Sequence, residues 1–252
     1  MDMQVDLLSD EGLATLLPSL LMTNPHRHYN RLATRVAAAS PDNPLTSAIT
    51  TILTAPAEDV AAAKIQGALF GWAALLPCLP KLRLADFRPA LRRLADRPSA
   101  LERQHGLPID ARELIEYIDR REPWVPVSKS DYLGLRSLDA VTCAAEMAPF
   151  VKGLLEWLQD PNWPIAEGCA MHLARFPELC ADPIRRVLER GDDAGWESQL
   201  LWFVSDNLAV RDCERMRAEL ERIVQRPTLA EEEEELGEVV LGILERMDYA
   251  RD

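Results

Sequence analysis

Apolar residues recur at helical spacing along almost the whole chain, and no window alternates apolar and polar residues in the manner of a strand. The clearest segment is residues 154–166, LLEWLQDPNWPIA, in which Leu154, Leu155 and Leu158 form an apolar stripe. Pro161 stops that helix, and Pro164 suits the first turn of the next one. The pattern predicts two antiparallel helices joined by a very short connection, which is more typical of a binding surface than of a catalytic centre.

Capping residues and prolines predict further helices in the first half of the chain. Asn24-Pro25 and Asn43-Pro44 each place a capping side chain before a proline, which predicts helices over 25–39 and 44–54. The alanine-rich segment 57–76 sets Ile65, Leu69, Trp72 and Leu76 on one face of a predicted helix. Other helices are expected after Ser9, over 86–95 and over 110–121.

The sequence Glu122-Pro123-Trp124-Val125-Pro126 interrupts the helices, because each proline disfavours the α conformation in the residue before it. We therefore expect an N-terminal helical region, residues 1–122, and a second domain, residues 126–252. In the second domain, short linkers of Pro, Gly and Asp separate the expected helices 144–159, 164–175, 182–190, 193–207, 211–226 and 229–247. Their lengths favour an all-α, HEAT-like stack of antiparallel helix pairs, although the pairs do not align as a sequence repeat.

The second domain also resembles a known family. The resemblance begins near Val125-Pro126-Val127-Ser128-Lys129-Ser130-Asp131 and continues through LLEWLQDPNWPIA, Pro183-Ile184, Asp192-Asp193, Trp196 and Trp202 into the Glu-rich end. The second domain is similar to the bacterial domain-of-unknown-function family 5071. The resemblance implies an all-helical, HEAT-like fold found near polymorphic-toxin loci, and it supplies no catalytic residues. The first 120 or so residues match no such pattern, and their lower aromatic and acidic content suggests a region added to the family core.

Charge divides the chain in the same place as the family resemblance. The net charge is −13, and residues 1–125 carry 14 basic and 15 acidic side chains, whereas residues 126–252 carry 14 basic and 26 acidic ones. So acidic a surface repels nucleic acid and anionic membranes and attracts cationic proteins. A purely solubilising role is the alternative. Basic residues concentrate instead at 81–103, where docking onto the acidic half is favoured over nucleic-acid binding because Phe87 is the one aromatic residue there.

Two clusters of acidic and aromatic residues are the candidates for partner contact. Thr228 and Glu231 form a predicted capping box, and the run from Glu231 to Glu235 suits the positive end of a helix dipole. The same run is also a candidate anionic patch. Tryptophan is dense between 157 and 202, where it fills a core or anchors an interface. The expected partner-binding residues are Asp192, Asp193, Trp196, Glu197, Asp206, Glu231, Glu232, Glu234 and Glu235.

Motifs of catalysis and cofactor binding are missing from the sequence. It contains no nucleophile elbow, no Gly-rich phosphate loop, no paired-histidine zinc helix and no EF-hand spacing, so we predict no catalytic residues, no cofactor and no metal. Cys169, His172 and Cys180 are conceivable ligands, but they lie on an apolar stripe and a fourth ligand is not evident. Five scattered cysteines and an acidic N-terminus without a signal-peptide pattern predict reduced thiols and a cytoplasmic location.

These observations favour an immunity protein that binds and occludes a cognate, cationic bacterial toxin domain. The alternative is a general protein-binding helical scaffold or adaptor, which needs the same surface without a toxin. A HEAT-like nucleic-acid enzyme is the third possibility, and the negative charge disfavours it. The sequence predicts neither a nucleic-acid nor a membrane partner.

Overall fold

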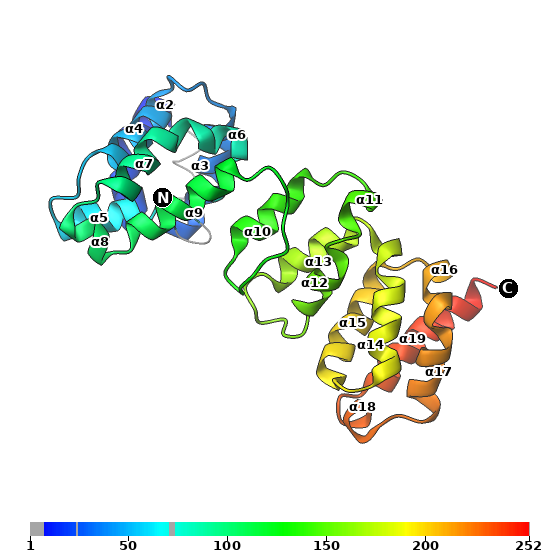
Figure 1. Ribbon diagram of the computed structural model, residues 1–252. Coiled ribbons are helices and arrows are strands. Elements are labelled where there is room, and N and C mark those ends of the chain that lie inside the picture. Colours follow the sequence, from blue (N-terminus) through cyan, green and yellow to red (C-terminus); the bar gives the residue numbers. More distant parts are fainter. Residues whose placement is uncertain (1–7, 24, 71–73, 252) are drawn as a thin grey trace. The chain divides into compact units, whose positions relative to one another are not determined.

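A computed structural model describes residues 8–23, 25–70 and 74–251, and it shows an all-α protein with no strand in those residues (Figure 1). The chain divides into two compact units, unit 1 from Met1 to Arg121 and unit 2 from Glu122 to Asp252. No helix among the described residues is both long enough and apolar enough to cross a bilayer.

Unit 1 is a bundle of short helices around a leucine-rich core. Its helices are α2 (Asp10–Thr23), α3 (Pro25–Ala38), α4 (Pro44–Thr54), α5 (Val60–Gly67), α6 (Lys81–Leu84), α7 (Arg88–Asp96), α8 (Ala100–Gln104) and α9 (Leu107–Asp119), with a 3-10 turn, η1 (Ala85–Phe87), before α7. Helix α7 packs on α9 and on α4, and α4 packs on α2. The side chains of Leu53, Phe87 and Leu91 are fully buried where these helices meet.

Unit 2 contains more helices and one continuous core. Its elements are α10 (Tyr132–Ser137), η2 (Leu138–Ala140), α11 (Ala144–Met147), α12 (Val151–Glu156), α13 (Ala166–Ala174), η3 (Pro177–Leu179), α14 (Ala181–Arg190), α15 (Ala194–Asn207), α16 (Val210–Cys213), η4 (Glu214–Met216), α17 (Arg217–Gln225), α18 (Leu229–Glu233) and α19 (Leu236–Tyr249). Leu154, Leu155 and Leu158 all lie in this core, as their stripe predicts. Helix α12 packs on α13, α17 packs on α19, and α15 packs on α19.

Several predicted helices have the expected bounds, because a local signal starts them. Asn43 accepts a hydrogen bond from the Leu45 N–H at 2.9 Å and caps α4 at the predicted residue. Asp193 caps α15 in the same way through the Trp196 N–H, at 3.0 Å.

Other helices were predicted as continuous and are shorter or broken in the structure. The expected helix 144–159 is broken before Val151, where Pro149 has no N–H to donate. The expected helix 57–76 is shorter, since α5 ends at Gly67 and Trp72 lies outside the described residues. The expected helices 211–226 and 229–247 are each divided in two, the second at Glu234 and Glu235. The all-α class is confirmed, and the HEAT-like superhelix stays a prediction.

Candidate functional site, an acidic corner of unit 2

A buried ion pair fixes the start of α18. Thr228 and Glu231 form the predicted capping box, in which the Thr228 N–H donates to Glu231 Oε2 at 2.6 Å and the Glu231 N–H donates to Thr228 Oγ1 at 3.2 Å. Arg222 from α17 donates to both oxygens of the Glu231 carboxylate, at 2.9 and 2.6 Å, and also to the Leu188 carbonyl at 3.1 Å. Burial raises the pKa of Glu231, but the Arg222 and Thr228 hydrogen bonds outweigh it, so the pKa falls below its ordinary value.

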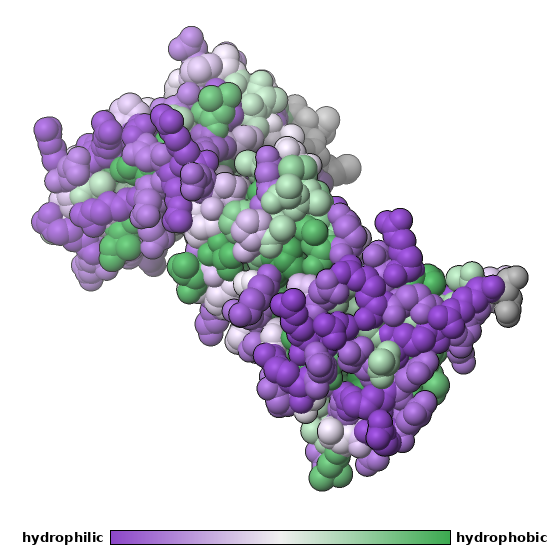
Figure 2. Space-filling model, turned by 45° about the vertical axis from the view of Figure 1, so that its right-hand side comes forward, coloured by the Kyte–Doolittle hydropathy of each residue, from purple (hydrophilic) through white to green (hydrophobic). Residues whose placement is uncertain are grey.

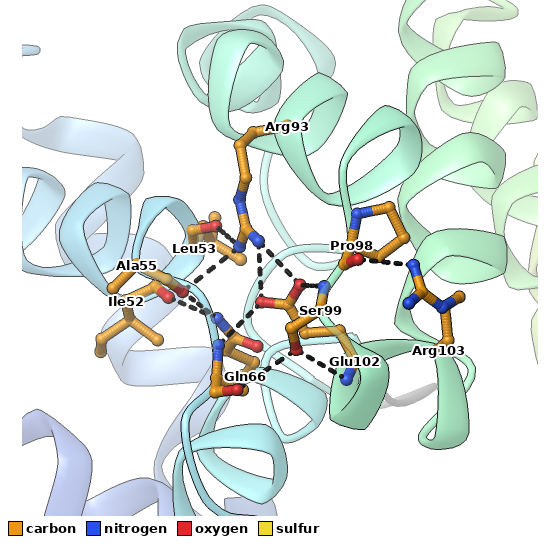
Figure 3. Close-up of polar contacts among 10 residues, drawn as sticks. Ile52, Leu53, Ala55, Gln66, Arg93, Pro98, Ser99, Glu102 and Arg103 are labelled. Carbon is orange, nitrogen blue, oxygen red and sulfur yellow. Dashed lines mark hydrogen bonds and ion pairs between the residues drawn. The ribbon is translucent and has the colours of Figure 1, made fainter.

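Unit 1 builds the same corner from equivalent residues. Ser99 and Glu102 form a capping box at α8, and Arg93 donates to both oxygens of Glu102 at 2.8 and 2.7 Å. Arg93 also donates to the Leu53 carbonyl, and Glu102 accepts from the Ala57 N–H at 3.1 Å (Figure 3). Glu102 is fully buried, like Glu231. We call each of these arrangements an Arg–Glu clamp, Arg222–Glu231 in unit 2 and Arg93–Glu102 in unit 1.

The residues that follow the two clamps differ in charge. In unit 2, Glu232, Glu233, Glu234 and Glu235 follow Glu231, and all four are exposed. In unit 1, Arg103, Gln104, His105 and Gly106 follow Glu102. Both corners therefore turn between two helices, and only the corner of unit 2 carries four consecutive carboxylates.

Glu235 adopts a backbone conformation that favours glycine. Its φ is 54°, and among the described residues it is the non-glycine residue with a positive φ. Gly106 occupies the equivalent turn in unit 1 with a φ of 76°. A side chain with a Cβ costs about 1 kcal/mol in this region relative to glycine. The glutamate at 235 is therefore strained in a position where the fold is better served by glycine.

The connection between α14 and α15 lies at the same end of unit 2 as α18 (Figure 1). A Cβ placed on Gly191 would lie 3.9 Å from Glu231 Oε1 and from Arg222 Nη2, so this loop lies against the clamp. Asp192 and Asp193 follow Gly191, and both are exposed. Asp192, Asp193 and Glu232–Glu235 together form the surface that we call the acidic corner. Hydrophilic residues predominate on the visible surface of the C-terminal part of unit 2 (Figure 2).

Three of the nine predicted partner-binding residues are buried, so the expectation that a partner could reach them is wrong. Trp196 is 8% exposed and donates its Nε1–H to the Leu155 carbonyl at 3.0 Å. Glu197 and Glu231 are 0% and 1% exposed. Trp196 and Glu197 lie in the first turn of α15, and that turn packs into the core. Glu231 is buried because it caps α18, as the structural interpretation of the Glu run predicted.

Glu197 is a buried acid beside the Arg222–Glu231 clamp. Neither oxygen of its carboxyl group has a hydrogen-bond donor among the described residues. Burial, which is the largest cause, and the negative charge of Glu231 together raise the pKa of Glu197 to about 7. A protonated Glu197 can donate its O–H to Glu231, so the two carboxyl groups share one negative charge beside Arg222.

The remaining predicted residues are exposed, but they do not all lie together. Asp206 is at the opposite end of α15 from Asp193, which a rise of about 1.5 Å per residue places about 20 Å away. Glu233, a member of the predicted anionic run, is exposed in α18, and so is Leu229, which was not among the predicted contacts and is 72% exposed. Of the tryptophans, Trp202 is 54% exposed. Trp157 and Trp163 are half-buried and form an edge-to-face pair whose ring centroids are 5.3 Å apart.

The basic stretch 81–103 has partners within unit 1. Arg83 pairs with Asp86, Arg88 with Asp119 and Arg93 with Glu102. The backbone carbonyl of Pro98 accepts from Arg103 at 2.7 Å. These contacts stabilise unit 1 itself.

Cys169 and Cys180 are fully buried in the core of unit 2, where burial raises the pKa of each thiol to about 12. The Nε2 atom of His172 lies 3.6 Å from Asp139 Oδ1, and its Nδ1 atom lies 3.1 Å from Arg175 Nη1. Among the described residues, no three side chains of the metal-binding types come together. Packing in the core accounts for both thiols.

Comparison with known proteins identifies the second half of the chain. Residues 124–244 match the family described as "Domain of unknown function (DUF5071)", and this match covers most of unit 2 and confirms the resemblance. No curated protein and no solved structure matches the chain.

Proposed function

We propose that this protein is an immunity protein that binds a cationic toxin domain through the acidic corner of unit 2 and covers the active site of that domain. The observation that carries the proposal is the run Glu232–Glu235, in which four exposed carboxylates occupy a corner that unit 1 builds without any of them. The toxin as the class of partner comes from the resemblance to a family found near polymorphic-toxin loci.

The energetics of the corner favour a role in binding over a role in folding. Of the five glutamates 231–235, the clamp and the capping box use only Glu231, and in unit 1 Glu102 performs the same task without a run of glutamates after it. Glu232–Glu235 add like charges side by side, which repel one another, and Glu235 adds backbone strain. Residues that destabilise a fold are retained most often at functional sites.

A partner with basic residues fits this surface. Carboxylates on a rigid helix corner attract a cationic protein over a distance of about 10 Å at moderate salt, which accelerates the encounter. Leu229, exposed in the first turn of α18, adds an apolar contact next to the charges. Affinity in such interfaces depends on a few buried anchors, whereas charge sets the association rate.

Co-expression with the adjacent candidate toxin tests the proposal. We expect the wild-type chain to restore growth and to co-purify with the toxin. A variant in which Glu232–Glu235 are all replaced by Gln is expected to restore growth poorly. The matched control replaces four exposed carboxylates elsewhere in unit 2, namely Glu156, Glu167, Glu178 and Glu245, and so changes the net charge equally.

The control variant is expected to protect cells as the wild type does. No rescue by the wild-type chain would refute the immunity proposal. Rescue that both variants lose equally would show that total charge matters and that the acidic corner does not.

A further inference from the structure

The second parts of the two units, α6 to α9 and α16 to α19, share one order of elements at a constant spacing. Helices α16, α17, α18 and α19 and the turn η4 each begin 129 residues after α6, α7, α8, α9 and η1 respectively. No residue is inserted or deleted between the start of α6 and the start of α9 relative to the corresponding stretch of unit 2. Chance rarely produces five successive boundaries in the same register.

The packing of the helices repeats as well. Seven pairs of helices that are in contact in unit 1 have counterparts that are in contact in unit 2. They are, with the unit 2 counterpart in parentheses, α2–α3 (α12–α13), α2–α4 (α12–α14), α4–α5 (α14–α15), α4–α7 (α14–α17), α6–α9 (α16–α19), α7–α9 (α17–α19) and α8–α9 (α18–α19). The correspondence therefore runs from α2 to α9 in unit 1 and from α12 to α19 in unit 2.

Specific side-chain contacts repeat as well, and the paired residues that lie between α7 and the end of α9 keep the spacing of 129 residues. Arg88 pairs with Asp119 in unit 1, and Arg217 pairs with Asp248 in unit 2 at 3.0 Å. The two Arg–Glu clamps repeat too, including the donation from each arginine to a carbonyl of an earlier helix, Leu53 in α4 or Leu188 in α14. Asp59 caps α5 through the third N–H of the helix, as Asp193 caps α15.

These contacts define a short sequence pattern that occurs in both units. It is Arg, three residues, Arg-Pro, Ser or Thr, two residues, Glu, four residues, Leu, and it begins at Arg93 and at Arg222. Over the aligned stretch, the identical pairs are Arg88 and Arg217, Leu91 and Leu220, Arg93 and Arg222, Arg97 and Arg226, Pro98 and Pro227, Glu102 and Glu231, Leu107 and Leu236, Glu116 and Glu245, and Asp119 and Asp248. Six of these nine pairs make the clamp, the Arg88–Asp119 ion pair and its counterpart, or the core.

We infer that unit 1 is a second, diverged copy of the domain that unit 2 forms, so the chain is a tandem of two domains of one kind. The N-terminal half is then a copy of the family domain and is not an unrelated addition to it. The copies differ in what they present: Arg92 and Arg103 in unit 1 correspond to Glu221 and Glu232 in unit 2. The tandem therefore offers two corners of one geometry, and only the corner of unit 2 is strongly acidic, because Arg103, Gln104, His105 and Gly106 take the places of Glu232–Glu235.

Exchange of the corner segments within the full chain tests this inference. Residues 99–106, SALERQHG, are replaced by the sequence of residues 228–235, TLAEEEEE. The matched control inserts the sequence of residues 227–234, PTLAEEEE, at the same place, which shifts the register by one residue and puts Ala at the position of Glu102. Thermal unfolding and amide hydrogen exchange of α7 and α9 report on unit 1.

The in-register exchange is expected to keep the amide protection of α7 and α9 and to lower the unfolding midpoint by no more than about 5 °C, because it places Glu at the positive φ of Gly106. The shifted control is expected to lose that protection. The reciprocal exchange, SALERQHG at residues 228–235, is expected to leave α17 and α19 protected and to raise the midpoint of unit 2. Equal damage from both insertions into unit 1, or equal tolerance of both, would overturn the inference.

Discussion

Replacing Glu197 by Gln is expected to stabilise unit 2 at neutral and alkaline pH and to change its stability by less than about 1 kcal/mol at pH 5. The carboxyl group of Glu197 is fully buried, and the clamp residues Glu231 and Arg222 are the charged groups that act on it. A Gln side chain keeps the size of the protonated acid, and its amide can donate to Glu231 as the acid does. It has no proton to lose when the pH rises.

The sign and size of the effect follow from the pKa. Burial and the negative charge of Glu231 raise the pKa of Glu197 from 4.5 to about 7, so between these values the native state binds more protons than the unfolded chain. The free energy of unfolding therefore falls as the pH rises through this window, by about 3 kcal/mol in total at about 1.4 kcal/mol per pKa unit. Above pH 8, the Glu197→Gln variant should exceed the wild type by about this amount.

Urea unfolding between pH 5 and pH 9 measures the difference. Tryptophan fluorescence reports on unit 2, because every tryptophan except Trp72 lies in that unit. Glu156→Gln is the control, since Glu156 is an exposed carboxylate of the same unit. If the free energies of unfolding of the wild type and the Glu197→Gln variant stay parallel over this pH range, Glu197 does not carry the buried proton.

Three further substitutions test the packing and the strain. Leu158→Asp is expected to destabilise unit 2 by more than about 3 kcal/mol, because it places a charge in the core; an unchanged unfolding midpoint would show that the buried face is misassigned. Gly134→Ala is expected to cost about 2 kcal/mol in urea unfolding, since its Cβ would lie 2.6 Å from Asp131 Oδ2 and 2.7 Å from Trp124 Nε1, and a neutral effect would contradict that close packing. Glu235→Gly is expected to raise the free energy of unfolding by about 0.5–1 kcal/mol, and a loss of stability would show that the positive φ carries no strain.

Local signals in the sequence predicted those parts of the fold that depend on neighbouring residues. Asn43-Pro44 starts α4 at the predicted residue, and Thr228 and Glu231 form the predicted capping box. The stripe of Leu154, Leu155 and Leu158 predicted which side of this segment is buried. Each of these features is set by residues within one or two turns of a helix.

Features that depend on distant residues escaped prediction. The break at Glu234 and Glu235 has no local signal, because glutamate rarely adopts a positive φ. The Arg222–Glu231 clamp shows that the turn is imposed by tertiary contacts. The signal for this break is Gly106, which lies 129 residues earlier and occupies the equivalent turn of unit 1.

The burial of Glu197 was missed for a similar reason. Its position near a helix start and its charge suggested an exposed residue. Its spacing of three and four residues from Leu200 and Leu201 placed it on the core face of α15, where both of those leucines are fully buried. The helical spacing from these leucines indicates the burial of Glu197, whereas its charge does not.

The central claim, that the acidic corner binds a cationic partner, is tested most directly by the association rate of the purified chain with the adjacent candidate toxin domain, measured by stopped flow at increasing salt. We expect the rate to fall at least tenfold between 20 and 500 mM salt, roughly the range that electrostatic steering spans, while the dissociation rate changes little. We expect the Glu232–Glu235 to Gln variant to associate about tenfold more slowly at low salt and to match the wild type at high salt. An association rate that is insensitive to salt, or equal for the wild type and this variant at low salt, would contradict the claim.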